Sequence, residues 1–337
     1  MRISSFTLLC LVCVASCTTP TSLGPERSGP YLGQPDPGDN LELFAPGTIS
    51  NGYHNRDIAI TPDGREIYTS VVLGNNSYSI IMVHKMVDGI WQEPVAASFS
   101  SGFRYLDVEP VISPDGKKVL FVSNRPDPAN GRSEENWDIW AAERKGDTWG
   151  EPYNLGVPVN SESDEYFPSL ARDGTIYFTR MEQETAANYI FRCRMEDGKY
   201  LEAEKLDKNV NCGRLRFNAM IAPDESFIIV SSAGREDSLG GADYYIVFRN
   251  EEDQWSPPVN MGEKINSPVG QEWSSSLSPD GKYLFFMKSL KNPAFDELTA
   301  DIKGVQRIAS SPRNGDADIY WIQSRIIEEL RKAAAIH

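Results

Sequence analysis

Short apolar and polar segments follow one another along this chain in an order that recurs five times. Each copy passes from an apolar segment through a tight polar turn into a run of β-branched and aromatic residues, which is typical of a strand. In these turns Pro presets φ, Asp accepts a hydrogen bond from nearby backbone, and Gly adopts a left-handed conformation. The turn aspartates are Asp63, Asp115, Asp173, Asp224 and Asp280. The runs that follow them are 66–69, 119–122, 176–179, 227–230 and 283–286.

The length of the repeat predicts the fold. The turn aspartates are 52, 58, 51 and 56 residues apart, which exceeds ankyrin or tetratricopeptide units and approaches one four-stranded propeller blade. A third strand is predicted at 137–140, 188–191, 242–246 and 317–321, with 78–81 as a weaker copy. A fourth, proline-containing edge strand is predicted at 91–95, 149–155 and 255–261, with 200–202 in the third unit. We therefore predict an all-β protein with a single propeller.

The two ends of the repeat array predict how the ring closes. The fifth unit has no fourth strand after residue 321, whereas 41–47 supplies a strand before the first unit. An N-terminal strand is therefore expected to close a ring of five blades. Six blades are the alternative, and they would need an undetected repeat within 291–314, which lacks strand alternation and favours a loop or short helix. Residues 324–336 predict a C-terminal helix that packs on the propeller through Ile326, Ile327 and Leu330.

The second unit is the most distinctive copy. It contains Ser113-Pro114-Asp115-Gly116-Lys117, then Phe121-Val122-Ser123-Asn124-Arg125, then Asp138-Ile139-Trp140. In this order these segments resemble a PD40 repeat, and residues 41–322 resemble the TolB-like β-propellers with WD40-like PD40 repeats. The resemblance implies a fold more than a function, because such propellers include partners of peptidoglycan-associated lipoproteins, peptidase propellers and carbohydrate-active enzymes.

The N-terminus has the features of an export signal. Residues 1–16 combine a positive start at Arg2 with an apolar segment too short to span a bilayer. They end in Val14-Ala15-Ser16-Cys17, which resembles a bacterial lipobox, so Cys17 is the expected lipidation site. Thr18 after this cysteine points away from inner-membrane retention. The expected organisation is signal peptide 1–16, flexible tether 17–40, propeller 41–322 and C-terminal helix 323–337.

The charge balance limits the partners. The chain has 48 acidic and 33 basic residues, a net charge of −15, which argues against nucleic acid or an anionic membrane surface as the main partner. Contact with a membrane is expected through the lipid anchor alone. Beyond the N-terminal 17 residues there are two cysteines, Cys193 and Cys212, which either pair in an oxidising compartment or remain as buried thiols.

Motifs for catalysis are lacking. The three histidines, His54, His84 and His337, form no H-E-x-x-H motif, and the chain has no G-x-S-x-G, Walker A or dinucleotide fingerprint. No metal site and no cofactor are expected.

Polar residues recur six to nine residues before the turn aspartates, where the inner strands should begin near the mouth of the channel. The candidates for a binding site there are Arg56, Asp57, Asp107, Glu109, Asp164, Glu165, Arg216, Asn218 and Glu272, beside His54 and Gln271. Carboxylates from several blades with two arginines could bind a sugar, a cation or a basic peptide end. The alternative is structural, in which each side chain satisfies backbone donors or a neighbouring blade. Trp137, Trp140 and Trp273 are expected to pack within the blades rather than to bind sugar.

Two functions follow from these features. The favoured one is a non-enzymatic binding or scaffold lipoprotein of the cell envelope, anchored at the outer membrane on its periplasmic or surface side. One propeller face would bind a protein, cell-wall or glycan partner. The alternative is a carbohydrate-active enzyme that uses central carboxylates. An enzyme needs a carboxylate pair in an open cleft, whereas a binding face needs a broad and partly apolar rim.

Overall fold

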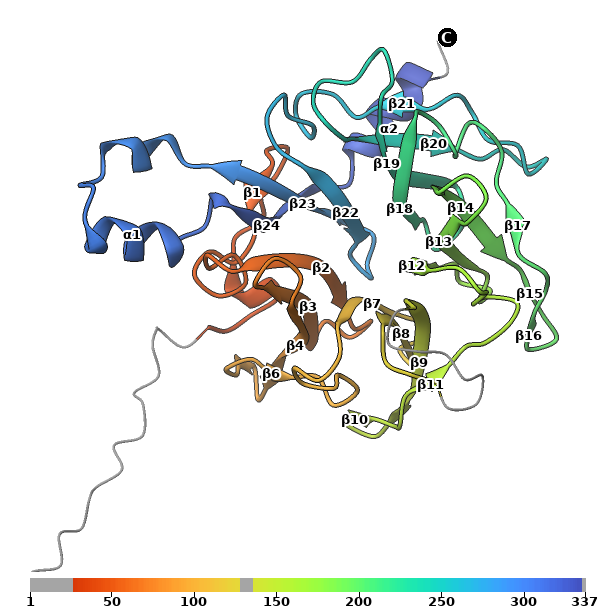
Figure 1. Cartoon of the computed structure of the whole chain (residues 1–337), viewed down its shortest axis with the longest axis horizontal. Helices are drawn as coiled ribbons and strands as arrows, with labels where there is room; N and C mark the ends of the chain where they lie inside the picture. Colours follow the sequence, from red (N-terminus) through yellow and green to blue (C-terminus); the bar gives the residue numbers. More distant parts are fainter. Residues whose placement is uncertain (1–26, 128–135, 335–337) are drawn as a thin grey trace, which may run out of the picture.

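The chain forms five antiparallel sheets arranged as blades around an axis, in a computed structural model that describes residues 27–127 and 136–334 (Figure 1). Blade 1 contains β2 (His54–Ile60), β3 (Glu66–Leu73), β4 (Tyr78–Val87), β5 (Ile90–Trp91) and β6 (Val95–Ala96). Blade 2 contains β7 (Asp107–Ile112), β8 (Lys118–Ser123), β9 (Asp138–Lys145), β10 (Thr148–Trp149) and β11 (Tyr153–Asn154). Blade 3 contains β12 (Glu165–Leu170), β13 (Ile176–Glu182), β14 (Ala187–Cys193) and β17 (Glu204–Lys205), beside a hairpin of β15 (Met195–Glu196) and β16 (Lys199–Tyr200). Blade 4 contains β18 (Leu215–Ile221), β19 (Phe227–Ala233), β20 (Asp243–Phe248) and β21 (Val259–Asn260). Blade 5 contains β22 (Glu272–Leu277), β23 (Tyr283–Lys291), β24 (Asn314–Gln323) and β1 (Glu42–Leu43).

The repeated turn connects the first and second strands of every blade. In blade 1, Asp63 accepts hydrogen bonds from the Thr61 hydroxyl at 2.6 Å and the Arg65 backbone N–H at 3.1 Å. Gly64 has φ of 69°, as this turn requires. Hydrogen bonding to the charged form outweighs partial burial and lowers the pKa of Asp63. The turn is therefore stabilised locally, which explains its recurrence.

The core lies between the blades. One apolar cluster fills the space between each neighbouring pair of blades, and together the clusters surround the axis. The cluster between blades 1 and 2, for example, packs Tyr68 and Ile81 against Phe121 and Trp149. Each blade is therefore stabilised by contacts with both neighbours, as in other repeat architectures.

The N-terminal strand closes the ring, as predicted. β1 pairs with β24 through Glu42 and Trp321 and through Leu43 and Tyr320, so the fourth strand of blade 5 comes from the opposite end of the repeat array. The next residue, Phe44, is fully buried and its ring centroid lies 5.1 Å from that of Phe285 and 5.1 Å from that of Trp321. The five-blade prediction is confirmed.

Part of the segment expected to be a flexible tether packs on the propeller. Its described part, residues 27–40, packs on the propeller, because η1 (Tyr31–Gly33) buries Leu32 between blades 5 and 1. The carboxylate of Asp36 accepts hydrogen bonds from Gln323 at 2.8 Å and from the Tyr283 hydroxyl at 3.0 Å. These long-range contacts could not be read from a segment rich in Pro, Gly and Ser.

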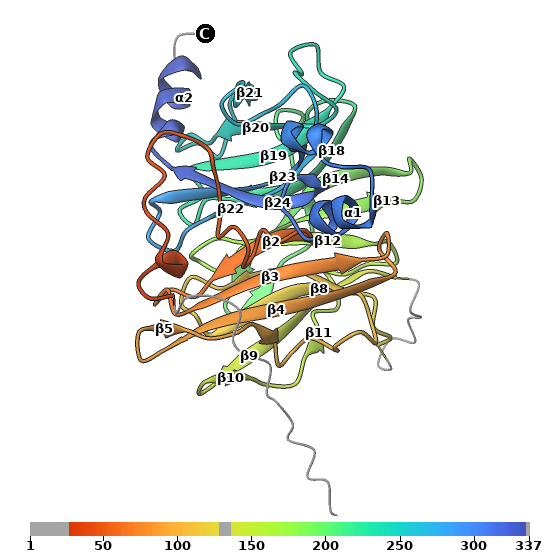
Figure 2. The same cartoon turned by 90° about the vertical axis from the view of Figure 1, so that its left-hand side faces the viewer.

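The two faces of the propeller differ. We call the face where the inner strands begin the loop face, and the face with the Pro-Asp-Gly turns the turn face; they lie at opposite ends of the strands in Figure 2. The insertion of blade 5 lies on the loop face and contains η2 (Pro293–Glu297) and α1 (Ile302–Ala309), in agreement with the predicted loop or short helix. The C-terminal helix α2 (Ile326–Ala334) lies on the turn face and buries Ile326 and Ile327 between blades 4 and 5.

One outer strand differs from its prediction. In blade 3 the outer strand is β17, whereas residues 200–202 were expected to form it. Tyr200 instead pairs with Met195 in a local hairpin. The sequence signal at this strand is weak because residues 200–205 lack the Trp and Pro of the other copies.

Candidate functional site

All five inner strands carry a β-bulge at the same place. The register against the second strand shifts between Arg56 and Ile58 in blade 1, and at the equivalent residues in the other blades. Four residues at this position have positive φ, namely Asp57 at 56°, Glu109 at 58°, Phe167 at 47° and Asn218 at 50°. A bulge re-aims the side chains on either side of it. The predicted site residues are therefore divided into two groups.

The first group anchors the loops that lead into the inner strands. Its members are Asp107, Glu165, Arg216 and Glu272, which lie eight residues before their turn aspartates and are buried. Asp107 accepts hydrogen bonds from the Ser101 backbone N–H at 2.6 Å and from Arg125 at 2.8 Å. Arg216 has the opposite charge and donates instead to loop carbonyls, including that of Gly213 at 2.7 Å. In both cases the side chain satisfies the polar groups of its own loop.

Glu165 and Glu272 repeat the pattern of Asp107. Glu165 accepts from the Ser161 hydroxyl at 2.6 Å and from Arg180 at 2.7 Å, and burial raises its pKa to about 7. Glu272 accepts from the Ser267 hydroxyl at 2.6 Å and lies 3.6 Å from the Lys288 ammonium, and burial raises its pKa as well. Its second oxygen has no hydrogen-bond partner among the described residues. The anchoring of blade 5 is thus less complete than that of blades 2 and 3.

The second group is an axial cluster of Arg56, Asp57 and Glu109. The Arg56 guanidinium donates to Asp57 at 3.0 Å and also to Glu109 in the neighbouring blade. Asp57 further accepts from the Ser274 hydroxyl at 2.7 Å, and the second oxygen of Glu109 accepts from the Phe167 backbone N–H at 2.6 Å. These contacts connect blades 1, 2, 3 and 5 across the axis.

The electrostatics of the axial cluster follow from its burial. Burial raises the pKa of Glu109 to about 7, against the effect of Arg56. The two neighbouring carboxylates raise the pKa of Arg56, which therefore stays charged. Both carboxylates are buried and bound to Arg56.

The remaining predicted residues lie apart from the cluster. Asn218 occupies the bulge position of blade 4, where its backbone N–H donates to the Thr179 hydroxyl at 3.0 Å. Asp164 lies on the loop face and accepts from the Trp137 backbone N–H and the Tyr166 hydroxyl, both at 3.1 Å. Cys17 lies outside the described residues. The structure therefore brings three predicted residues together at the axis and does not gather all of them into one ring.

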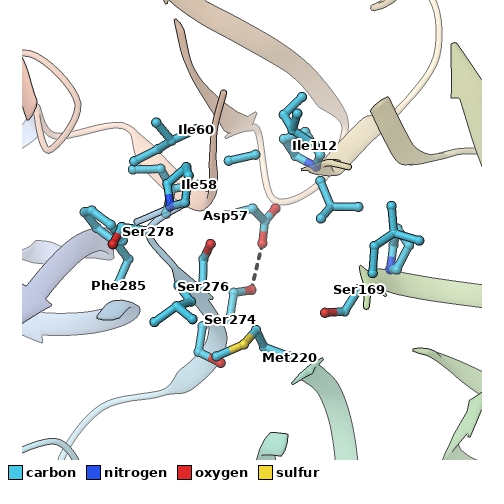
Figure 3. Close-up of a pocket in the computed structure, with 18 of the residues that line it drawn as sticks. Asp57, Ile58, Ile60, Ile112, Ser169, Met220, Ser274, Ser276, Ser278 and Phe285 are labelled. Atoms are coloured by element: carbon cyan, nitrogen blue, oxygen red, sulfur yellow. Dashed lines mark hydrogen bonds between the residues drawn. The ribbon is translucent and has the colours of Figure 1, made fainter. Parts of the chain in front are cut away.

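A cavity that sequence reasoning missed lies on the turn side of the axial cluster. It encloses about 230 Å³ and is lined by apolar side chains of the inner strands, such as Ile58, Ile112 and Met220 (Figure 3). Hydroxyl groups enter from Ser169 and Ser274, the latter bound to Asp57 (Figure 3). The sequence signal for this cavity is the serine run 274–276, because the equivalent positions of the other inner strands are mostly apolar.

Exposed apolar side chains gather on the loop face. Of the thirteen large apolar side chains that are exposed in the described residues, nine belong to loops or strand ends on this face. They are Tyr53, Tyr78, Phe103, Val157, Leu215, Leu239, Val269, Ile302 and Val305. Exposed apolar groups concentrated on one side of a protein are typical of an interaction surface, whereas single scattered ones are normal.

Other chemistry is limited in the part of the chain that the structure describes. There, no three histidine, cysteine or acidic side chains are grouped so as to hold a metal ion. No helix in residues 27–127 or 136–334 is long and apolar enough to cross a membrane. Cys193 and Cys212 are free and buried in different clusters, and burial raises the pKa of both thiols.

The fold and these geometries define a five-bladed propeller with a closed axis and a partly apolar loop face. No protein-family model matches the chain, and a search of curated proteins gives no match. Among solved structures, TolB from Acinetobacter baumannii is similar with a TM-score of 0.45 and 14% identity, over 81% of this chain and 57% of that chain. The chain thus spans less than two thirds of the length of that TolB.

Two further solved structures are similar at the same level. A nidogen/laminin complex has a TM-score of 0.41 and 14% identity over 64% of this chain and 71% of that chain. A K499G mutant of NanB sialidase from Streptococcus pneumoniae has a TM-score of 0.39 and 12% identity over 73% of this chain and 35% of that chain. Similarity at this level concerns the fold alone. No family model supports the PD40 or lipoprotein assignments.

Proposed function

We propose that this chain is a non-enzymatic binding lipoprotein of the cell envelope, whose loop face binds a protein or cell-wall partner. The observation that carries the proposal is the gathering of nine of the thirteen exposed large apolar side chains on that face. Aromatic and apolar side chains surrounded by polar groups are typical of a binding surface.

The path of the N-terminal segment supports an orientation in which the loop face is directed away from the membrane. The Tyr31 hydroxyl lies 3.3 Å from Asp280, a turn-face residue, so the chain reaches the propeller at the turn face. With a lipid on Cys17, the ten residues from there to Arg27 span at most about 35 Å. The turn face would then be directed to the membrane, and the loop face would be directed away from it.

The axial carboxylates favour binding over catalysis. A glycosidase needs one carboxylic acid and one carboxylate on either side of an open sugar site. The observation that favours such an enzyme is the raised pKa of Glu109, about 7, because this carboxyl lies beside a second one at the axis. However, Glu109 and Asp57 are both buried and both bound to Arg56. The cavity that they line encloses about 230 Å³, which is below the roughly 300–1,000 Å³ of a small-molecule site, so they do not flank a space large enough for a sugar chain.

Site-specific photo-crosslinking in the native envelope tests the proposal. A photoreactive side chain at Phe103, which is 60% exposed on the loop face, is expected to give discrete crosslinked partners. The matched control is Val87, which is 52% exposed on the turn face and is expected to give none of these adducts. Identical adducts from both positions, or no adducts from the loop face, would refute the binding face.

A further inference from the structure

The insertion of blade 5, residues 292–313, projects from the loop face, and we call it the wall. It joins β23 to β24 through 22 residues, 292–313, whereas the equivalent connection of blade 1 has four residues, 74–77. The wall is held against blade 1 at Gly52, where a Cβ atom would lie only 2.6 Å from the Ala309 carbonyl oxygen. The side chain of Asn314 donates to the Gly52 carbonyl at 2.9 Å. This insertion therefore has a defined position beside blade 1 (Figure 1).

A cleft lies between this wall and the loop-face ends of blades 1 and 5. Its volume is about 1360 Å³, larger than the roughly 300–1,000 Å³ of a site for one drug-sized molecule. Blade 1 contributes Tyr53 and the β3–β4 turn, and blade 5 contributes the start of β22 and the insertion. The cleft can therefore hold an extended ligand of several units.

The side chains of the cleft combine aromatic rings with free amide groups. Tyr53 is 55% exposed, and Trp273 packs on the cluster between blades 5 and 1 while it also lines the cleft. The side chains of Asn75, Asn76 and Gln271 make no hydrogen bond within residues 27–127 and 136–334. This contrasts with the axial cluster, where every polar side chain is bound to another residue.

The charges of the cleft nearly balance. The lining contains three basic residues, Lys264, Lys291 and Arg313, and two acidic residues, Asp296 and Asp316. His54 lies 3.6 Å from Asp316. Burial lowers the pKa of His54, so it is mostly neutral at pH 7. A nucleic acid or a strongly charged peptide would not be favoured here.

These features match a sugar chain. Amide side chains both donate and accept hydrogen bonds, as each sugar hydroxyl does, and aromatic rings cover the apolar faces of sugar rings. We propose that the cleft between blade 5, its insertion and blade 1 binds a neutral oligosaccharide. This proposal rests on the proposed binding function and assigns a ligand class to one part of the loop face.

Calorimetric titration with neutral hexasaccharides tests the proposal. The probes are maltohexaose, cellohexaose, xylohexaose and chitohexaose, added to the wild-type protein and to two variants. At least one probe is expected to bind, and Tyr53→Ser is expected to weaken its affinity by about tenfold or more. Tyr78→Ser is the matched control, because Tyr78 is 54% exposed on the same face but does not line the cleft, so its affinity should stay unchanged.

The outcomes separate this proposal from the proposed function. If none of the four sugars binds, or if Tyr53→Ser and Tyr78→Ser weaken binding equally, the sugar site is refuted while photo-crosslinking still tests the binding face. If a displayed dodecapeptide library instead yields peptides that need Tyr53, the ligand class is wrong. If a sugar is bound and cleaved, the sugar class stands and the non-enzymatic function fails.

Discussion

The carboxylate of Asp107 provides the sharpest test of the loop-anchoring role. It accepts five hydrogen bonds, from Ser100, from the backbone and hydroxyl of Ser101, from Ser123 and from Arg125. Asp107→Asn keeps the shape but replaces an acceptor oxygen with a donor group that faces other donors. The Arg125 side chain, which is only 12% exposed, also loses its charged partner. Loss of one partner from a buried ion pair costs about 3–5 kcal/mol of unfolding free energy.

The equivalent substitution in blade 5 should behave differently. Glu272 accepts one short hydrogen bond, from Ser267, and one of its oxygens is buried without a partner among the described residues. Its pKa is raised by burial, so the folded state binds the proton more tightly than the unfolded state does. The ionised carboxylate therefore destabilises the fold at pH 7, and Glu272→Gln removes this cost together with the attraction to Lys288. Lys288 keeps its hydrogen bond to the Ile265 carbonyl, and burial lowers the pKa of this ammonium, so Lys288 depends on its carboxylate less than Arg125 does. We expect a net change within about 1 kcal/mol.

Thermal unfolding at pH 7 compares the two variants. For a chain of this size about 2–4 °C corresponds to 1 kcal/mol, so Asp107→Asn should lower Tm by roughly 6–20 °C and Glu272→Gln by less than about 4 °C. Glu93→Gln, on the exposed outer part of blade 1, is the control and should change Tm by less than about 2 °C. Equal losses at Asp107 and Glu272, or a higher Tm for Asp107→Asn, would refute the anchoring account.

Three further predictions concern the fold and its anchor. Burial raises the pKa of Glu109 and Glu165 to about 7, and that of Asp318 to about 6, so these groups stabilise the folded state as pH falls from 7 towards 4.5. Burial lowers the pKa of His54 and His84, which offsets part of this gain below about pH 6.5, and the turn aspartates, with lowered pKa values, lose their stabilising contribution below about pH 4. Tm should therefore peak near pH 5, and a steady rise of Tm up to pH 8 would contradict this. Phe44→Ala should lower the unfolding free energy by about 3–5 kcal/mol, because it leaves a cavity at the junction between β1 and blade 5. Glu42→Ala on the same strand should be nearly neutral, and similarly small changes in thermal unfolding for both variants would show that β1 does not close the ring. Cys17→Ser should move the protein from membranes to the soluble fraction, and retention in membranes after a high-salt wash would disprove the lipid anchor.

The blade architecture could be predicted from sequence because its signals are local. Each Pro-Asp-Gly turn is stabilised by hydrogen bonds within five residues, such as those of Asp63 with Thr61 and Arg65. Every copy of the turn can therefore be recognised from its own short sequence. The closing strand followed from counting strands at the two ends of the array. The packing of residues 27–40 could not be predicted, because it depends on contacts such as Asp36 with Gln323, which are 287 residues apart.

The candidate site was predicted only in part, and the reason is the β-bulge. Side chains alternate between two sides of a strand, so one extra residue changes which side each one faces. Residues two positions apart, such as Asp107 and Glu109, were therefore expected at one mouth, but they lie in a loop anchor and in the axial cluster. The cleft was missed because it depends on where the insertion packs, at Gly52, which no periodic pattern encodes.

Release of reducing ends is the measurement that tests binding against catalysis most directly. The wild-type protein and Glu109→Gln would be incubated with the four neutral hexasaccharides at pH 5 and pH 7. We predict no release above the buffer rate for either protein, including for any sugar that binds in the titrations. Release by the wild-type protein that Glu109→Gln abolishes would contradict the account, because it would make the axial cluster a catalytic site.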